Sequence, residues 1–119
     1  MVLKSTDSVD FGLITSCSAV YARSDEGKAV VYHWPGTAWT TSSIQKMTEA
    51  LNEIGWTKKS SAFSIHVYKQ AYNGTIESYK AEMDIFAANL KNMFTPNVQY
   101  TIYPDKSYLT MDGTGKVNV

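Results

Sequence analysis

Two neighbouring segments in the first third of the chain are rich in apolar residues. Residues 14–23 are rich in β-branched and aromatic side chains, and a second apolar run covers residues 29–34. The serine, aspartate and glycine of residues 24–28 favour a turn between them. This pattern predicts an antiparallel β-hairpin, in which the start of the first strand lies beside the end of the second.

Two later segments have the three- and four-residue spacing of amphipathic helices. The first follows Ser42, which with Gln45 three residues later resembles a capping box, and it ends before Gly55. The second follows Thr75, a predicted N-cap, and carries the clearest apolar stripe in the chain. We expect both stripes to pack on a sheet. They consist of Ile44, Met47, Leu51 and Ile54 in the first helix, and of Ile76, Tyr79, Met83, Phe86, Leu90 and Met93 in the second.

The other apolar segments predict further strands. In residues 62–69, Phe63, Ile65 and Val67 alternate with polar side chains, which is typical of a strand with one buried face. Shorter strands are predicted over residues 98–103, 108–111 and 116–119. The order of elements predicts an α+β fold in a single domain over residues 1–119, with two main helices packed on a mixed, mostly antiparallel and sandwich-like sheet.

Charge and hydropathy narrow the range of partners. Eleven basic and eleven acidic residues cancel, and like charges form no run, so the sequence predicts no nucleic-acid partner. No segment approaches the length of a membrane span, and the first residues lack the pattern of a secretory signal. We therefore expect synthesis in the cytoplasm, which is compatible with export by an apparatus that reads no cleaved signal.

The candidate chemistry centres on Cys17, the single cysteine of the chain. The predicted hairpin brings it close to His33, so that the imidazole can act as general base and acid for a thiolate nucleophile. Such a site also needs donors aimed at the developing oxyanion. We expect these near-site groups at Thr15, Ser16 and Ser18, including their backbone amides.

A third group must orient His33, and the sequence leaves it open. Asp7, Ser8 and Asp10 are candidates, as is any backbone carbonyl. His66 competes for the role of base, but it lies on the polar face of its strand and is expected to be a solvated or hydrogen-bonded surface residue. Two histidines and one cysteine are too few for a usual zinc site, and no phosphate loop or dinucleotide fingerprint is present, so neither metal nor cofactor is expected.

The hairpin also resembles a known catalytic motif. Residues 16–23, a short turn, and Val31-Tyr32-His33-Trp34-Pro35-Gly36-Thr37 are similar to the catalytic hairpin of the cytotoxic necrotizing factor toxins, in which a histidine followed closely by Gly-Thr comes after the cysteine. The CheD-type chemoreceptor deamidases and Burkholderia lethal factor share this order of cysteine and histidine. The resemblance implies a deamidase-like fold and a protein glutamine deamidase, with Cys17 as nucleophile and His33 as general base and acid. It also implies a secreted bacterial effector or toxin that needs no cofactor, and a partner protein bearing a target glutamine, such as a host GTPase or another regulatory protein.

The chain departs from these families at defined positions. Ser16 stands where the toxins have glycine, and Phe11 stands where the CheD and Burkholderia enzymes have a catalytic threonine. The Gly-x-Arg-Asn stretch of the CheD enzymes is absent, which favours a toxin-like substrate over a chemoreceptor. Three alternatives remain: a transglutaminase, a CheD-type chemoreceptor deamidase, and a non-enzymatic protein-binding module in which Cys17 is simply packed.

Overall fold

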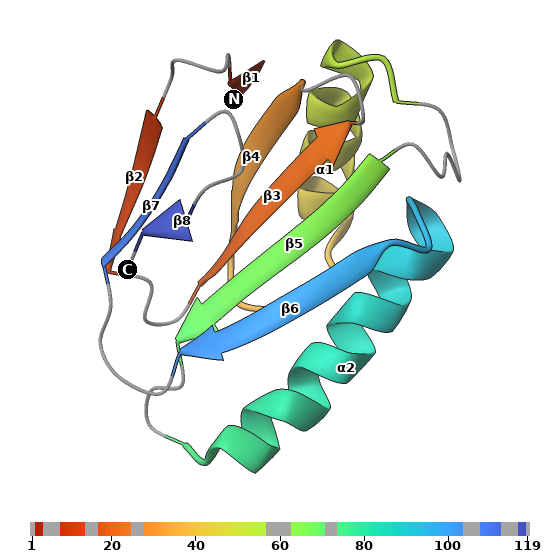
Figure 1. The fold of residues 1–119 in the computed structure, drawn as a ribbon. Helices are drawn as coiled ribbons and strands as arrows, with labels where there is room; N and C mark the ends of the chain where they lie inside the picture. The colour runs from red at the N-terminus through yellow and green to blue at the C-terminus, as the bar shows by residue number, and fades with distance from the viewer. Residues whose placement is uncertain are drawn as a thin grey trace.

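The computed structural model describes residues 2–3, 8–13, 17–24, 28–56, 63–70, 74–103, 108–112 and 117–118. These residues form an α+β fold with two helices and two sheets (Figure 1). Neither helix in this part of the chain is long and apolar enough to cross a membrane. In chain order the elements are β1 (Val2–Leu3), β2 (Ser8–Leu13), β3 (Ser18–Ser24), β4 (Ala29–Trp34), α1 (Thr41–Glu53), β5 (Phe63–Gln70), α2 (Ile76–Met93), β6 (Val98–Tyr103), β7 (Tyr108–Asp112) and β8 (Val117–Asn118).

The larger sheet has five strands in the order β1-β4-β3-β5-β6. Strand β3 lies at its centre and pairs antiparallel with both β4 and β5, whereas β6 runs parallel to β5 after the crossover through α2. The predicted hairpin and the mixed, mostly antiparallel sheet are therefore confirmed. In the register of these ladders, Ala19 of β3 pairs with His33 of β4 on one side and with Tyr68 of β5 on the other.

A second sheet of three antiparallel strands, β2-β7-β8, lies on the β4 side of the larger sheet, away from β6 and α2 (Figure 1). Its strand β2 was not predicted from the sequence. Strand β2 pairs with β7, near the other end of the chain, from Ser8 opposite Asp112 to Leu13 opposite Tyr108. The two ends of the chain are thus joined in one sheet.

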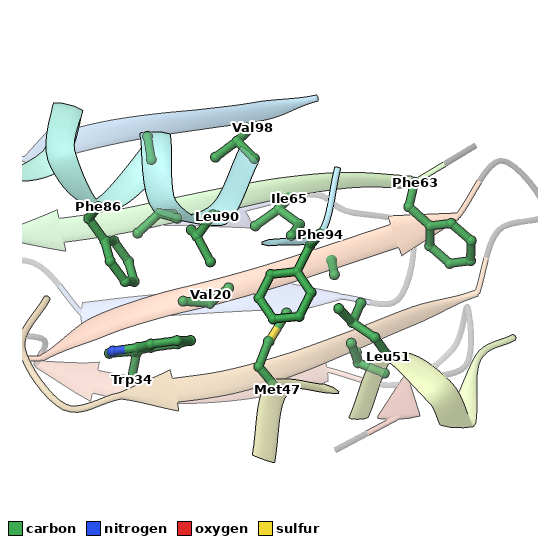
Figure 2. Packing of buried hydrophobic residues seen from close by; sticks show 14 of the residues in the cluster. Val20, Trp34, Met47, Leu51, Phe63, Ile65, Phe86, Leu90, Phe94 and Val98 are labelled. Carbon is green, nitrogen blue, oxygen red and sulfur yellow. The ribbon is translucent and has the colours of Figure 1, made fainter. Parts of the chain in front are cut away.

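The core lies between the larger sheet and the two helices (Figure 2). Trp34 of β4 is fully buried in this core, stacked on Trp39 with ring centroids 5.5 Å apart and edge-on to Phe86 of α2 at 5.0 Å. The predicted apolar face of β5 is confirmed. So are most positions of the helical stripes, because Met47, Leu51, Ile54, Met83, Phe86 and Leu90 are all buried. Ile76, in contrast, is 46 % exposed, because it occupies the first turn of α2, beyond the edge of the core.

The ends of the helices differ from the prediction at one cap. The predicted capping box at Ser42 is wrong, since the N-cap of α1 is Thr40, two residues earlier, and its hydroxyl accepts a hydrogen bond from the Ser43 amide at 3.2 Å. Thr75 caps α2 as predicted, accepting from the Ser78 amide at 3.1 Å. Gly55 follows α1 with a φ of 80°, a left-handed conformation that explains why a glycine ends this helix.

Candidate active site

Cys17 and His33 lie at the same end of the β3–β4 hairpin. Cys17 is half-buried and immediately precedes β3. His33 is exposed and is the second-to-last residue of β4. Since His33 pairs with Ala19, continuing the alternation of β3 back to Cys17 places the two side chains on one face, as diagonal neighbours. Diagonal neighbours in an antiparallel pair are roughly 7–8 Å apart between Cα atoms, which is within reach of an imidazole and a thiol.

Ser18 lies on the opposite face of β3 from this pair. It pairs with the core residue Trp34, is fully buried, and donates a hydrogen bond from Oγ to the Gly36 carbonyl at 2.8 Å. The Ser18 hydroxyl is therefore committed to the loop after β4 and does not point toward an oxyanion at Cys17. The other two predicted near-site residues, Thr15 and Ser16, lie outside the described residues.

The loop that follows His33 is held at several points. The Trp34 indole donates from Nε1 to the Ala38 carbonyl at 2.8 Å. The Thr37 hydroxyl donates to the carboxylate of Glu82 on α2. Together with the bond from Ser18 to Gly36, these contacts tie the loop to β3, to α2 and to itself. These contacts restrain the backbone that follows His33, and a catalytic pair benefits from such restraint.

The candidates for orienting His33 are placed only in part. Asp7 lies outside the described residues, while the backbones of Ser8 and Asp10 belong to β2 and pair with Asp112 and Thr110 of β7. This strand is in the second sheet and forms no ladder with β4. Neither Ser8 nor Asp10 therefore lies on a strand next to His33.

His66 lies farther from Cys17 than His33 does and is therefore the poorer candidate for the general base. It lies on the same face of the sheet but pairs with Tyr21, four residues along β3 from Cys17, which corresponds to roughly 13 Å at the rise of an extended strand. Its ring contacts Tyr21 with centroids 6.1 Å apart, and it is half-buried. Burial, and then the positive charge of Arg23, lower the pKa of His66 below its usual 6.5.

Gln70, at the end of β5, is a site residue that the sequence did not reveal. Ser18 pairs with Lys69, so continuing this antiparallel register by one residue places Gln70 opposite Cys17. The alternation of β5 puts it on the face of Tyr68, away from the helices, and its side chain is fully buried. The sequence shows that alternation, but nothing in it indicates that a polar residue at the strand end is buried.

No known protein family and no curated protein sequence matches the chain. The chemistry therefore has to be argued from the side chains at this end of the sheet. They provide a thiol, an imidazole on the neighbouring strand, and a carboxamide on the strand at the other side. Such a group of side chains is suited to covalent attack on an acyl carbon, with the imidazole carrying the proton.

Proposed function

We propose that the protein is a glutamine deamidase that converts glutamine to glutamate on a target protein. The observation that supports this most is the placement of Cys17 and His33 on one face at neighbouring strand ends. A cysteine beside a histidine is the usual arrangement of a thiolate nucleophile. The α+β fold and the resemblance of the hairpin to the necrotizing factor toxins agree with the same reaction.

The reaction proceeds through a thioester and involves no change in oxidation state. Cys17 Sγ attacks the side-chain carboxamide carbon of the target glutamine, and the carbonyl electrons move to its oxygen. As the carbonyl re-forms, the C–N bond breaks and ammonia leaves with a proton from the His33 imidazolium. The neutral imidazole then takes a proton from water, which attacks the thioester, and cleavage of the C–S bond releases glutamate and the thiol.

The biological role we propose is that of a secreted bacterial effector or toxin. It would be made in the bacterial cytoplasm and exported without a cleaved signal. Its target would be a host GTPase or another regulatory protein, because deamidation replaces a neutral carboxamide with a carboxylate and so disables a hydrolytic or regulatory glutamine. The resemblance of residues 16–23 and 31–37 to the toxin hairpin supports this role.

Intact mass spectrometry tests the proposal. Candidate regulatory proteins incubated with the enzyme should gain about one dalton per modified glutamine, and Cys17→Ser and His33→Ala should each abolish the gain. His66→Ala is the matched control, because it removes the other histidine of the same face, and it should retain activity. A mass gain equal to an added amine minus ammonia would instead identify a transglutaminase.

The rate of thiol alkylation separates the enzyme from a non-enzymatic binding module. Iodoacetamide should modify Cys17 faster than it modifies free cysteine, and His33→Ala should remove the acceleration. A thiol that reacts no faster than free cysteine, with or without His33, would favour a protein-binding module and contradict catalysis.

A further inference from the structure

Gln70 has an environment that is unusual for a side-chain amide. It is fully buried, yet neither its Nε2 nor its Oε1 has a hydrogen-bond partner within the part of the chain that the structure describes. Buried polar groups in folded proteins are almost always paired, because an unpaired one keeps the full cost of losing its contact with water. Folding stability alone therefore favours an apolar residue at this position.

The position of Gln70 relates this unpaired amide to the candidate active site. Continuing the register of β3 and β5 by one residue places it directly across from Cys17, on the side away from β4 and His33. Directly opposed residues in an antiparallel pair have Cβ atoms roughly 4.5–5.5 Å apart. A group attacked by the Cys17 thiol would thus lie between His33 and Gln70.

The described neighbours of Gln70 on this face are mainly aromatic. Tyr68 and Tyr103 stack on each other with ring centroids 6.2 Å apart, and Tyr103 pairs with Gln70 in the parallel register. Ala19 of β3 pairs with Tyr68 on the same face, is fully buried and carries only a methyl group. The register thus places ring and methyl groups next to Gln70 on this face. A hydrogen bond to a ligand is strong where water is excluded.

We propose that Gln70 recognises the primary carboxamide of the substrate. This inference rests on the proposed deamidase function and names the chemical group that the site selects. The Gln70 Nε2 donates to the carboxamide oxygen of the target glutamine, and its Oε1 accepts from the carboxamide nitrogen. The two amides then form a pair with two complementary hydrogen bonds. Neither polar atom of Gln70 is exposed in this structure, so the proposed pairing requires the side chains that cover Gln70 to move aside.

This pairing explains both catalysis and product release. When the thiolate adds to the carboxamide carbon, negative charge develops on the oxygen that the Gln70 Nε2 contacts, and this hydrogen bond strengthens in the transition state. When the C–N bond breaks, ammonia leaves from the Oε1 side. The glutamate product carries an oxygen where the substrate carried N–H, so it faces the Gln70 Oε1 with a like partial charge and is rejected.

Alkylation with two matched reagents tests the recognition without a known protein substrate. Iodoacetamide carries a primary carboxamide and iodoacetate a carboxylate on the same carbon skeleton. The ratio of their rate constants at Cys17 should exceed the ratio measured for free cysteine, and Gln70→Met should return it to the free-cysteine value. Gln99→Met is the matched control and should leave the ratio unchanged. Gln99 is an exposed glutamine of β6 that lies on the same face of the sheet as Gln70.

Turnover of a small substrate tests the catalytic part. With benzyloxycarbonyl-Gln-Gly and ammonia release as the readout, Gln70→Met should lower kcat about 100- to 1000-fold, with a smaller change in KM. The melting temperature of Gln70→Met should stay equal to that of the wild type or rise, because a buried unpaired amide is removed. Gln70→Leu provides a second apolar variant if Gln70→Met does not fold.

The outcomes distinguish this inference from the proposed function. If the wild type releases no more ammonia than Cys17→Ser, the proposed function fails, and the reagent ratio still tests Gln70. If the wild type is active and Gln70→Met retains kcat and the reagent ratio within twofold, the role of Gln70 is overturned. Conversion of Gln70 itself to glutamate in the purified wild type, detected by peptide mass spectrometry, would also overturn it, because Gln70 would then be a substrate.

Discussion

The Ser18 hydroxyl donates a hydrogen bond to the Gly36 carbonyl at 2.8 Å, joining the residue after Cys17 to the loop after His33. The Ser18 hydroxyl is fully buried, whereas Gly36 is half-buried. Ser18→Ala leaves the Gly36 carbonyl without this partner. We expect a loss of about 1–2 kcal/mol in the free energy of unfolding, measured in urea, and slower alkylation of Cys17. Ser64→Ala, at a half-buried serine of β5, is the control and should change neither quantity. An unaltered alkylation rate in Ser18→Ala would show that this bond does not position the nucleophile.

Trp34 combines the largest buried ring surface with a hydrogen bond to the loop. Trp34→Phe removes the donor to the Ala38 carbonyl and reduces the stack on Trp39. We expect a destabilisation of about 2–4 kcal/mol, which reflects a cavity in addition to an unpaired carbonyl. Trp39→Phe, at a partly buried ring that donates no such bond here, should cost less. Equal losses in thermal unfolding of the two variants would contradict the special place of Trp34.

The N-cap of α1 can be tested by comparing the contributions of two hydroxyl groups, those of Thr40 and Ser42, to stability. Thr40→Ala removes the acceptor for the Ser43 amide and should lower the free energy of unfolding by about 1 kcal/mol. Ser42→Ala, in an exposed position inside the helix, should be neutral or slightly stabilising, because alanine favours helix. Chemical denaturation of both variants checks the order, and the reverse order would restore Ser42 as the cap.

Gly55 tests backbone conformation separately from packing. Its φ is 80°, while a Cβ added there would meet no atom of the described residues within 4 Å. Gly55→Ala should therefore cost about 1–2 kcal/mol through the left-handed conformation alone, and Gly55→Asn should cost less, because asparagine tolerates it. Urea titrations of the two variants measure the difference. Equal destabilisation by alanine and asparagine would point to another cause.

His66 should make the protein less stable at acidic pH. Its folded pKa lies below the unfolded value of 6.5, so the unfolded chain binds more protons in the interval between them. The free energy of unfolding therefore falls as pH is lowered through 6.5 and levels off below the folded pKa. His66→Asn should flatten the melting temperature between about pH 7 and pH 5 relative to the wild type. Arg23→Gln should flatten it partly, since the Arg23 charge is the second cause of the shift. A melting profile unchanged by His66→Asn would contradict this assignment.

The fold was predictable wherever one periodicity dominated a segment. The alternation of Phe63, Ile65 and Val67 and the stripe of α2 follow from side chains that must share one apolar face. The β3–β4 hairpin follows from two apolar runs joined by turn residues. Strand β2 was missed, although Val9, Phe11 and Leu13 alternate with polar residues. Its partner β7 comes from the far end of the chain, so no neighbouring turn in the sequence indicated the pairing.

The candidate site was predictable only where neighbouring strands follow each other in sequence. Cys17 and His33 belong to one hairpin, and a short turn fixes their relation. Gln70 comes from a strand on the other side of β3, and its place opposite Cys17 depends on a register set by Ser18 and Lys69. Ser18 faces the core because of the register of β3 with its two neighbouring strands. Amino-acid composition does not determine this register.

The two ladders of β3 also have consequences for the order in which the chain folds. The β4 ladder closes a small loop, whereas the β5 ladder forms only after α1 and the residues around it have been accommodated between the strands. Small loops close at lower entropic cost and therefore earlier, both in solution and as the chain emerges from the ribosome. A nascent chain thus brings its thiol and imidazole together before its amide arrives. Under our proposal, chemical reactivity is acquired first and selectivity for carboxamides last.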